Sequence, residues 1–377
     1  MPASHLPIYL DYNATTPLHD AAMAAMQSVM GAPANPSSVH HHGRQARFEM
    51  EKARRQIASL LECQPAELIF TSGATESNNM VLAGFEQVIT TTIEHDAVRQ
   101  ARPDAHFIEV DENGLVKLDM LHSALKGLSD DVRAKTLVSV MAANNETGVI
   151  QPLSEIAAIT KEAGVFFHSD MAQLPGKVPV NIETSLSALA ADGLDFASFS
   201  AHKMGGPAGV GALWVRAGRR VPAMLHGGGQ EQGWRAGTEN LIGIVGFGAA
   251  AEATEKRQAQ TEIWQSWRDE ICAHIRISCP SVICFSEAVP RLSNTLCLGF
   301  PGWSATSAVM ALDLAGFSVS AGSACSSGKV KSSHVIEAMG YHDLAASCLR
   351  ISFGWDSQRD ELMMLADQLI DLYKRQA

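Results

Sequence analysis

Short apolar runs alternate with segments of helical periodicity through the first two thirds of the chain. A helix is predicted over 73–83, and another opens at Pro152 and ends near Gly164, because proline favours the first turn of a helix and glycine its end. Strands separated by helical crossovers indicate an α/β domain whose central sheet is mostly parallel and flanked by helices. The runs of strand length are 68–71, 87–91, 107–110, 136–141, 165–170, 196–200 and 212–215.

The last third of the chain has a different pattern. Residues 241 to about 275 are predicted to form one long helix, and a final helix begins at Arg359. We therefore predict a large domain over 15–250 and a smaller α+β domain made of 1–14 and 251–377, with the boundary inside the long helix. The strand-length runs of this part are 281–285, 293–298, 318–321 and 350–353.

Composition and charge exclude several classes of protein. The 377 residues are 46% hydrophobic and 18% charged, which excludes a disordered chain and a long charged coiled coil. A net charge of −11 argues against broad binding of nucleic acid or of an anionic membrane. No apolar run approaches the roughly 18 residues of a membrane span, and the start of the chain lacks the pattern of a signal peptide. Seven cysteines in so long a chain do not form a disulfide framework, so we expect a soluble cytoplasmic protein.

The segment Thr71–Glu76 follows a predicted strand and opens a predicted helix. Its glycine lets the backbone approach an anion, its hydroxyl groups donate hydrogen bonds, and the helix N-terminus favours negative charge. These properties suit a phosphate group. The same residues also fit an ordinary helix start, with a Ser or Thr cap and a Glu in the first turn, so both interpretations stay open at this point.

Two strand ends carry residues suited to one cofactor. Asp170, with Gln173 nearby, ends the run 165–170, and ligands of open α/β sheets bind outside the carboxyl ends of strands. A carboxylate there can keep the pyridinium nitrogen of pyridoxal phosphate protonated, although it could also cap the next turn. Lys203 follows the run 196–200, where a partly desolvated amine becomes a nucleophile, although most lysines are solvated at the surface.

Cysteines and histidines supply further candidates. Cys325 is surrounded by small residues, which is typical of a loop that could bring a thiol to a site, or of an incidental free cysteine. Cys284 and Cys297 lie in apolar runs and are expected to be buried, inert thiols. His95 follows the run 87–91 and could stack or transfer protons at a strand-end site. The adjacent histidines 40–42 diverge in direction and have no second ligand cluster, so no metal site is predicted.

Taken in chain order, these motifs resemble the cysteine desulfurases of the NifS/IscS type, which are class V aminotransferases of pyridoxal phosphate fold type I. The resemblance covers nearly the whole chain. It implies the fold type I architecture, in which a large domain with a mostly parallel sheet is joined to a smaller α+β domain, and a homodimer. The segments that carry it are 9–17, 35–38, 72–77, 144–148, 170–173, 200–203, 226–231, 235–238, 320–328 and 350–354.

The resemblance also implies how each matching residue holds pyridoxal phosphate. Lys203 would bind the cofactor covalently, Asp170 would pair with its pyridine nitrogen, and His95 would stack on its ring. Gln173 would contact the ring hydroxyl. The remaining cofactor residues would hold the phosphate, and they are Ala74, Thr75, Ser200, His202 and, from the second subunit, Thr238.

The implied reaction converts L-cysteine to L-alanine. Asn145 and Arg350 would grip the substrate carboxylate, for which the fork of an arginine is suited. Lys203 would act as the base and His95 as a proton shuttle. The thiolate of Cys325 would take the sulfur as a persulfide and pass it to an acceptor protein, such as an iron–sulfur scaffold, or to other thio-compounds.

Other functions stay open on the residues themselves. An aminotransferase or a selenocysteine lyase of the same fold type would share the cofactor residues, and Cys325 distinguishes the aminotransferase, which needs no such loop. Selenocysteine as a substrate is compatible with the sequence. A non-catalytic sulfur carrier would have no need of Lys203, Asp170 and Arg350. A nucleotide-binding dehydrogenase is disfavoured because no Gly-x-Gly-x-x-Gly follows the first strand.

Overall fold

The largest sheet has seven strands, and most of them are parallel, as predicted. The computed structural model describes residues 7–33, 35–178, 185–257, 259–322 and 332–376. Within the sheet, the order is β2-β8-β7-β6-β5-β3-β4, and the strands from β7 to β4 are parallel, whereas β8 runs antiparallel to both of its neighbours. Its strands are β2 (Leu68–Thr71), β3 (Gln87–Thr91), β4 (His106–Ile108), β5 (Thr136–Ser139), β6 (Phe166–Asp170), β7 (Phe196–Ser200) and β8 (Gly211–Val215).

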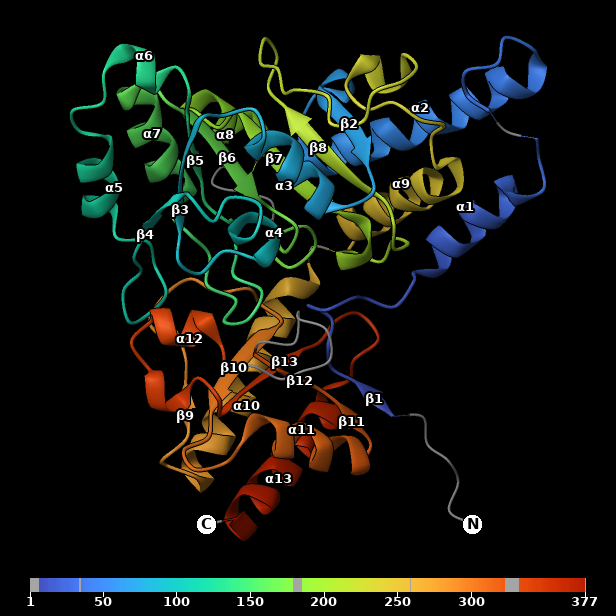
Figure 1. Ribbon diagram of the computed structural model, residues 1–377. Coiled ribbons are helices and arrows are strands. Elements are labelled where there is room, and N and C mark those ends of the chain that lie inside the picture. The colour runs from blue at the N-terminus through green and yellow to red at the C-terminus, as the bar shows by residue number, and fades with distance from the viewer. Residues whose placement is uncertain (1–6, 34, 179–184, 258, 323–331, 377) are drawn as a thin grey trace.

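Helices cover both faces of this sheet (Figure 1). Alternate residues of a strand point to opposite faces, and β2 shows the consequence. Leu68 and Phe70 join a core cluster with α2, α7, α8 and α9, whereas Ile69 joins another with α3. The helices of this part are α1 (Asp20–Met30), α2 (His41–Leu61), α3 (Ala74–Leu82), α4 (Asp96–Arg99), α5 (Leu118–Leu125), α6 (Asp130–Arg133), α7 (Leu153–Ala163), α8 (Leu186–Asp192), α9 (Leu241–Glu255) and the 3₁₀ turns η1 (Pro65–Glu67), η2 (Ala201–Lys203) and η3 (Gln230–Gly233).

Two smaller sheets lie in the lower half of Figure 1, and one of them contains the N-terminal segment. An antiparallel sheet has the order β12-β13-β10-β9, and β1 pairs in parallel with β11. The division of the chain into domains at residues 14/15 and 250/251 stays a prediction. The elements are β1 (Ile8–Tyr9), β9 (Ile283–Cys284), β10 (Thr295–Gly299), β11 (Phe317–Ser318), β12 (Ser320–Ala321), β13 (Cys348–Ser352), α10 (Gln260–Ser278), α11 (Ala305–Leu314), α12 (His334–Ala338), η4 (His342–Leu344) and α13 (Arg359–Gln376).

The prediction of one long helix from residue 241 to about 275 is wrong. The helix α9 ends at Glu255 and α10 begins at Gln260. No proline or glycine marks the break, because tertiary packing determines it: α9 packs on α1 and α2, whereas α10 packs on α13. Beside the break, the guanidinium of Arg257 lies 4.2 Å from the ring centroid of Trp355.

The prediction for Cys284 is also wrong. This residue is half-buried and forms a disulfide with Cys272 of α10, whose Cα atom lies 6.6 Å from its own. The apolar neighbours of Cys284 suggested a buried strand, but β9 is short and stands at the edge of its sheet. Cys297, on the adjacent strand β10, is buried as predicted. None of the described helices is long and apolar enough to cross a membrane.

Candidate active site

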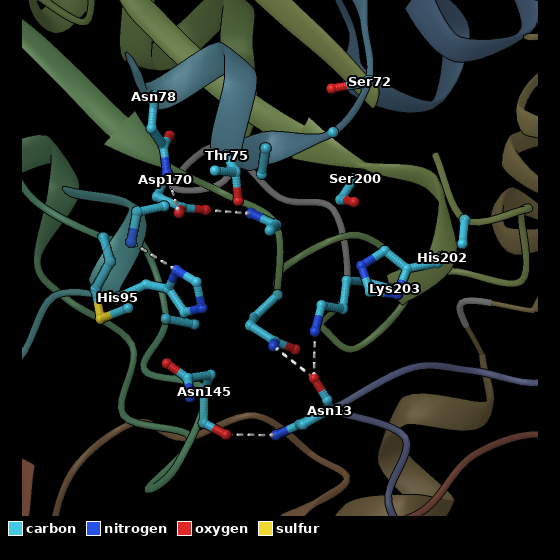
Figure 2. Close-up of a pocket in the computed structure, with 18 of the residues that line it drawn as sticks. Asn13, Ser72, Thr75, Asn78, His95, Asn145, Asp170, Ser200, His202 and Lys203 are labelled. Carbon is cyan, nitrogen blue, oxygen red and sulfur yellow. Dashed lines mark hydrogen bonds between the residues drawn. The ribbon is translucent and has the colours of Figure 1, made fainter. Parts of the chain in front are cut away.

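A cavity of about 300 Å³ lies at the carboxyl ends of β6 and β7 and at the N-terminus of α3 (Figure 2). It brings together residues that are distant in the sequence, as the predicted strand-end site requires. Among the residues singled out from the sequence, those that line the cavity are Ala74, Thr75, His95, Asn145, Asp170, Gln173, Ser200, His202 and Lys203.

One end of the cavity has the features of an anion site. Gly73 precedes α3 with a φ of 153°, and no side-chain cap covers the N-terminus of this helix in the part of the chain described. The backbone of β8 packs closely against this turn: a Cβ added at Gly211 would lie 2.6 Å from Gly73 Cα and 2.4 Å from Phe199 O. The exposed N–H groups of the first turn therefore face the cavity beside the hydroxyl group of Ser200 (Figure 2).

His202 lies near the same end and is neutral at physiological pH. Burial, together with the positive charges of Lys203 and Lys177, lowers its pKa to about 4. Its Nδ1 atom lies 3.2 Å from Thr15 Oγ1. A neutral imidazole presents one N–H donor, which suits an anion.

Asp170, at the end of β6, is fixed in the cavity wall by two donors. Asn78 Nδ2 donates to Asp170 Oδ2 at 2.7 Å, and the backbone N–H of Ala172 donates to Oδ1 at 3.0 Å. No motif discussed above singles out Asn78. Its position four residues after Ala74 on the predicted helix places both on one helix face, and this spacing could have revealed it.

His95 and Lys203 lie on opposite sides of the cavity in Figure 2. The Nδ1 atom of His95 accepts a hydrogen bond from the N–H of Ala97 at 3.1 Å, so the proton of the neutral ring is on Nε2. Lys203 Nζ donates to the backbone oxygens of Asn13 at 2.6 Å and Ala14 at 2.8 Å. The amine is thereby held at the edge of the cavity, where a nucleophile is needed.

Asn145 and Arg350 are in contact, but only Asn145 lines the cavity. Arg350 is fully buried behind it. Arg350 Nη1 donates to Asn145 O at 3.0 Å, and Nη2 pairs with Asp11 Oδ1 at 2.7 Å. The partner Asp11 was missed, because a single acid in a loop has no spacing signal.

Two of the predicted residues, Thr238 and Cys325, remain. Thr238 is exposed and does not line the cavity, and its predicted role belongs to a second subunit. Cys325 lies outside the described residues. The flanking residue Ser333 donates to Glu146 Oε2 at 2.5 Å, and burial raises the pKa of Glu146 to about 7.

Comparisons with known proteins assign the family. The aminotransferase class-V profile matches residues 8–365. The cysteine desulfurase IscS of Dictyoglomus turgidum is 37% identical over 96% of this chain and 93% of its own, and the putative cysteine desulfurase IscS 1 of Bacillus subtilis is 36% identical over 98% and 99%. The chain belongs to the cysteine desulfurases of the class-V aminotransferase family.

Solved structures agree with this assignment. The NifS-like protein of Rickettsia africae has a TM-score of 0.89 and 33% identity, over 98% of this chain and 99% of its own. SspA, solved in complex with cysteine, has a TM-score of 0.76 and 29% identity, over 92% and 98%. The predictions of fold type I and of a pyridoxal-phosphate-dependent cysteine desulfurase are confirmed.

The residues of the cavity fit pyridoxal phosphate. The N-terminus of α3 suits its phosphate, and an anchored carboxylate, Asp170, suits its pyridine nitrogen. The Lys203 amine lines the same cavity. The Oδ1 atom of Asn78 is buried and finds no donor among the described residues. The cavity therefore has a suitable group for the phosphate, for the pyridine nitrogen and for covalent attachment of the cofactor.

Proposed function

We propose that this cavity converts L-cysteine to L-alanine and that Cys325 takes the sulfur atom. The observation that supports this most is the convergence of the α3 N-terminus, Asp170 and Lys203 on one cavity. The substrate is proposed from the names of the relatives and from SspA, whose structure contains cysteine.

Lys203 and Asp170 would have different roles toward the cofactor. Lys203 would bind it covalently and, once displaced by substrate, would remove the proton from the substrate α-carbon. Asp170, held by Asn78, would keep a proton on the pyridine nitrogen. When bound, pyridoxal phosphate supplies an electron sink for the electrons of the α-carbon.

Asn145 would bind the substrate carboxylate at the cavity wall, and Arg350, which lies buried behind that wall, would bind it after turning toward the cavity. The guanidinium of Arg350 is shared with Asp11, so this acid orients the arginine before substrate arrives. The side chain of Asn145, at the cavity wall, would supply a second contact. Two polar groups from different elements would fix one orientation of the amino acid, which is the condition for selective proton removal.

Sulfur transfer would use Cys325 as a thiolate. It attacks the substrate sulfur, the S–S bond of a persulfide forms, and the bond between that sulfur and the substrate β-carbon breaks. The electron pair of the broken bond passes to the carbon skeleton, which takes up a proton and leaves as L-alanine. His95, which lines the cavity, would supply protons there from its Nε2–H.

The finer details of partners and location belong to the same proposal. The persulfide would pass its sulfur to an acceptor protein such as an iron–sulfur scaffold, and the cytoplasm is the expected compartment. A homodimer is supported by exposed apolar side chains on α1 and α2, namely Met23, Met30 and Phe48. In such a dimer the exposed Thr238 would reach the phosphate of the other subunit.

The test measures sulfide and alanine released from L-cysteine in the presence of a reductant. The parent protein and a Cys63→Ser control are expected to form both products, and Cys325→Ser is expected to lose them. If Cys325→Ser released sulfide at the rate of the parent protein, the proposed role of Cys325 would be contradicted. Absence of both products from the parent would contradict the proposed function.

A further inference from the structure

Lys177 is a buried lysine beside the cavity that no role assigned above explains. It is 4% exposed and follows β6 by several residues. Its Nζ atom donates to Gln173 Oε1 and, at 2.9 Å, to Asn13 Oδ1. Burial of an ammonium group costs free energy that two hydrogen bonds to neutral oxygens only partly offset. A methionine would fill similar space at less cost, so a lysine here needs a reason.

The first consequence concerns the orientation of Gln173. Lys177 Nζ donates to the amide oxygen of Gln173, so the NH₂ group of Gln173 faces the other way. One N–H of that group donates to Asn13 O at 3.0 Å. Gln173 also lines the cavity, so the second N–H is the donor it can offer to a ligand there. Without Lys177 the amide oxygen loses its donor, and only the hydrogen bond from Nε2 to Asn13 O holds the NH₂ group in this orientation.

The second consequence concerns Lys203. The backbone oxygen of Asn13 accepts hydrogen bonds from both Gln173 Nε2 and Lys203 Nζ. The side chain of Asn13 is held at Oδ1 by Lys177 and at Nδ2 by Thr295 Oγ1 at 2.9 Å. Lys177 therefore holds Asn13, whose backbone oxygen accepts a hydrogen bond from the Lys203 amine.

Burial and the neighbouring charges change the pKa of the Lys177 amine. Burial lowers the pKa of Lys177 well below its ordinary value, and the positive charges of Lys203 and Arg350 lower it further, whereas Asp11 opposes them. Lys177 does not line the cavity that Asp170 and the N-terminus of α3 line; together with Lys203 it lines a much smaller neighbouring cavity of about 20 Å³. It therefore acts on a ligand through its neighbours and not by contact.

We propose that Lys177 is a positioning residue of the cofactor site, which holds the Gln173 amide with its NH₂ group toward the cavity and the Asn13 carbonyl against Lys203. This inference rests on the proposed function, in which Lys203 and Gln173 contact pyridoxal phosphate. In this proposal Lys177 affects cofactor binding through Gln173. The coupling between the two residues can be measured as a difference in cofactor affinity between single and double variants.

The test uses Lys177→Met, Gln173→Ala and the double variant, with Lys161→Met as the control. Lys161 donates to the Ala191 carbonyl on the surface. Each apo-protein is titrated with pyridoxal phosphate. Lys177→Met and Gln173→Ala are each expected to weaken binding about tenfold, the effect of one lost hydrogen bond to a charged group. In the Gln173→Ala background, Lys177→Met is expected to weaken it by less than about threefold, because the two residues act together.

A spectrum separates positioning from simple support of the fold. An N–H donor to the ring oxygen favours its ionised form, so the visible absorption band of the bound cofactor is expected to lose intensity in Lys177→Met and to stay unchanged in Lys161→Met. Lys177→Gln, which keeps a polar group, replaces Lys177→Met if the latter does not fold.

The outcomes distinguish the two levels of the proposal. A parent protein that binds no pyridoxal phosphate contradicts the proposed function and this inference with it. If the parent binds it and Gln173→Ala weakens binding, then unchanged affinity and spectrum in the Lys177 variant overturn the inference alone. Additive effects in the double variant also overturn it, because Lys177 would then not act through Gln173.

Discussion

Asn78 and Asp170 form the contact on which the chemistry of the ring nitrogen depends. Replacing Asn78 with Ala removes the donor to Asp170 Oδ2 and leaves the one from Ala172, so the carboxylate is less well oriented. We expect kcat for L-cysteine to fall about tenfold, the effect of one lost hydrogen bond to a charged group. The control Asn79→Ala removes an amide of the same helix that bonds to backbone oxygens and not to Asp170, and a smaller loss is expected. Equal losses in both variants would contradict the assignment.

Glu94, which precedes His95, is a buried acid with a pH-dependent effect on stability. Burial raises its pKa from 4.5 to about 8. Between these values the folded protein keeps a proton that the unfolded chain has lost. The free energy of unfolding therefore falls as pH rises through this window, by up to about 1.4 kcal/mol per pH unit.

The variant Glu94→Gln tests this effect. Its amide resembles the protonated acid, so its free energy of unfolding is expected to fall less steeply between about pH 5 and about pH 8. Denaturant unfolding of the two apo-proteins at several pH values measures the difference. Parallel pH dependences would show that Glu94 does not hold the extra proton.

At the scale of elements, the anion site depends on the close approach of β8 to the turn before α3. In Gly211→Ala the added Cβ would meet backbone atoms of Phe199 and Gly73, which cannot give way as a side chain end can. We expect a loss of about 1–3 kcal/mol of stability and weaker binding of pyridoxal phosphate. Gly31→Ala, whose added Cβ meets nothing within 4 Å, is the matched control. Parent-like melting and binding in Gly211→Ala would contradict this account of the turn.

The elements that could be predicted from the sequence are those whose ends are marked locally. The strand Phe196–Ser200 was predicted with the bounds that it has. The helix after Pro152 ends at Gly164, whose φ of 69° lies in the region that glycine favours. The break between α9 and α10 has no such marker and follows from packing on different partners.

The same reasoning explains which site residues were found. Residues at strand ends, such as Asp170 and Lys203, follow from the topology of an open sheet, and family resemblance supplied their roles. Asn13, Asp11 and Lys177 could not be found in this way. They act through pairs that are far apart in the sequence, such as Asn13 with Lys177, and only the folded chain brings these together.

At the scale of the whole molecule, the site draws on both halves of the chain and, in the proposal, on a second copy. Phe48, on α2, is 56% exposed and would lie in the subunit interface. We expect Phe48→Asp to shift the protein from dimer to monomer in light scattering and to lower its turnover of L-cysteine, since Thr238 of the partner would be lost. Ile277→Asp, at a residue 81% exposed on α10, should leave the mass unchanged. A monomeric parent of full activity would contradict the dimer.

The most direct test asks which lysine binds the cofactor, since Lys203 and Lys177 both donate to Asn13. The protein is loaded with pyridoxal phosphate and reduced with borohydride, and its peptides are mapped by mass spectrometry. We predict that the added mass is found on Lys203, which lines the cavity. Added mass on Lys177 instead, or on neither residue, would contradict the account of this site.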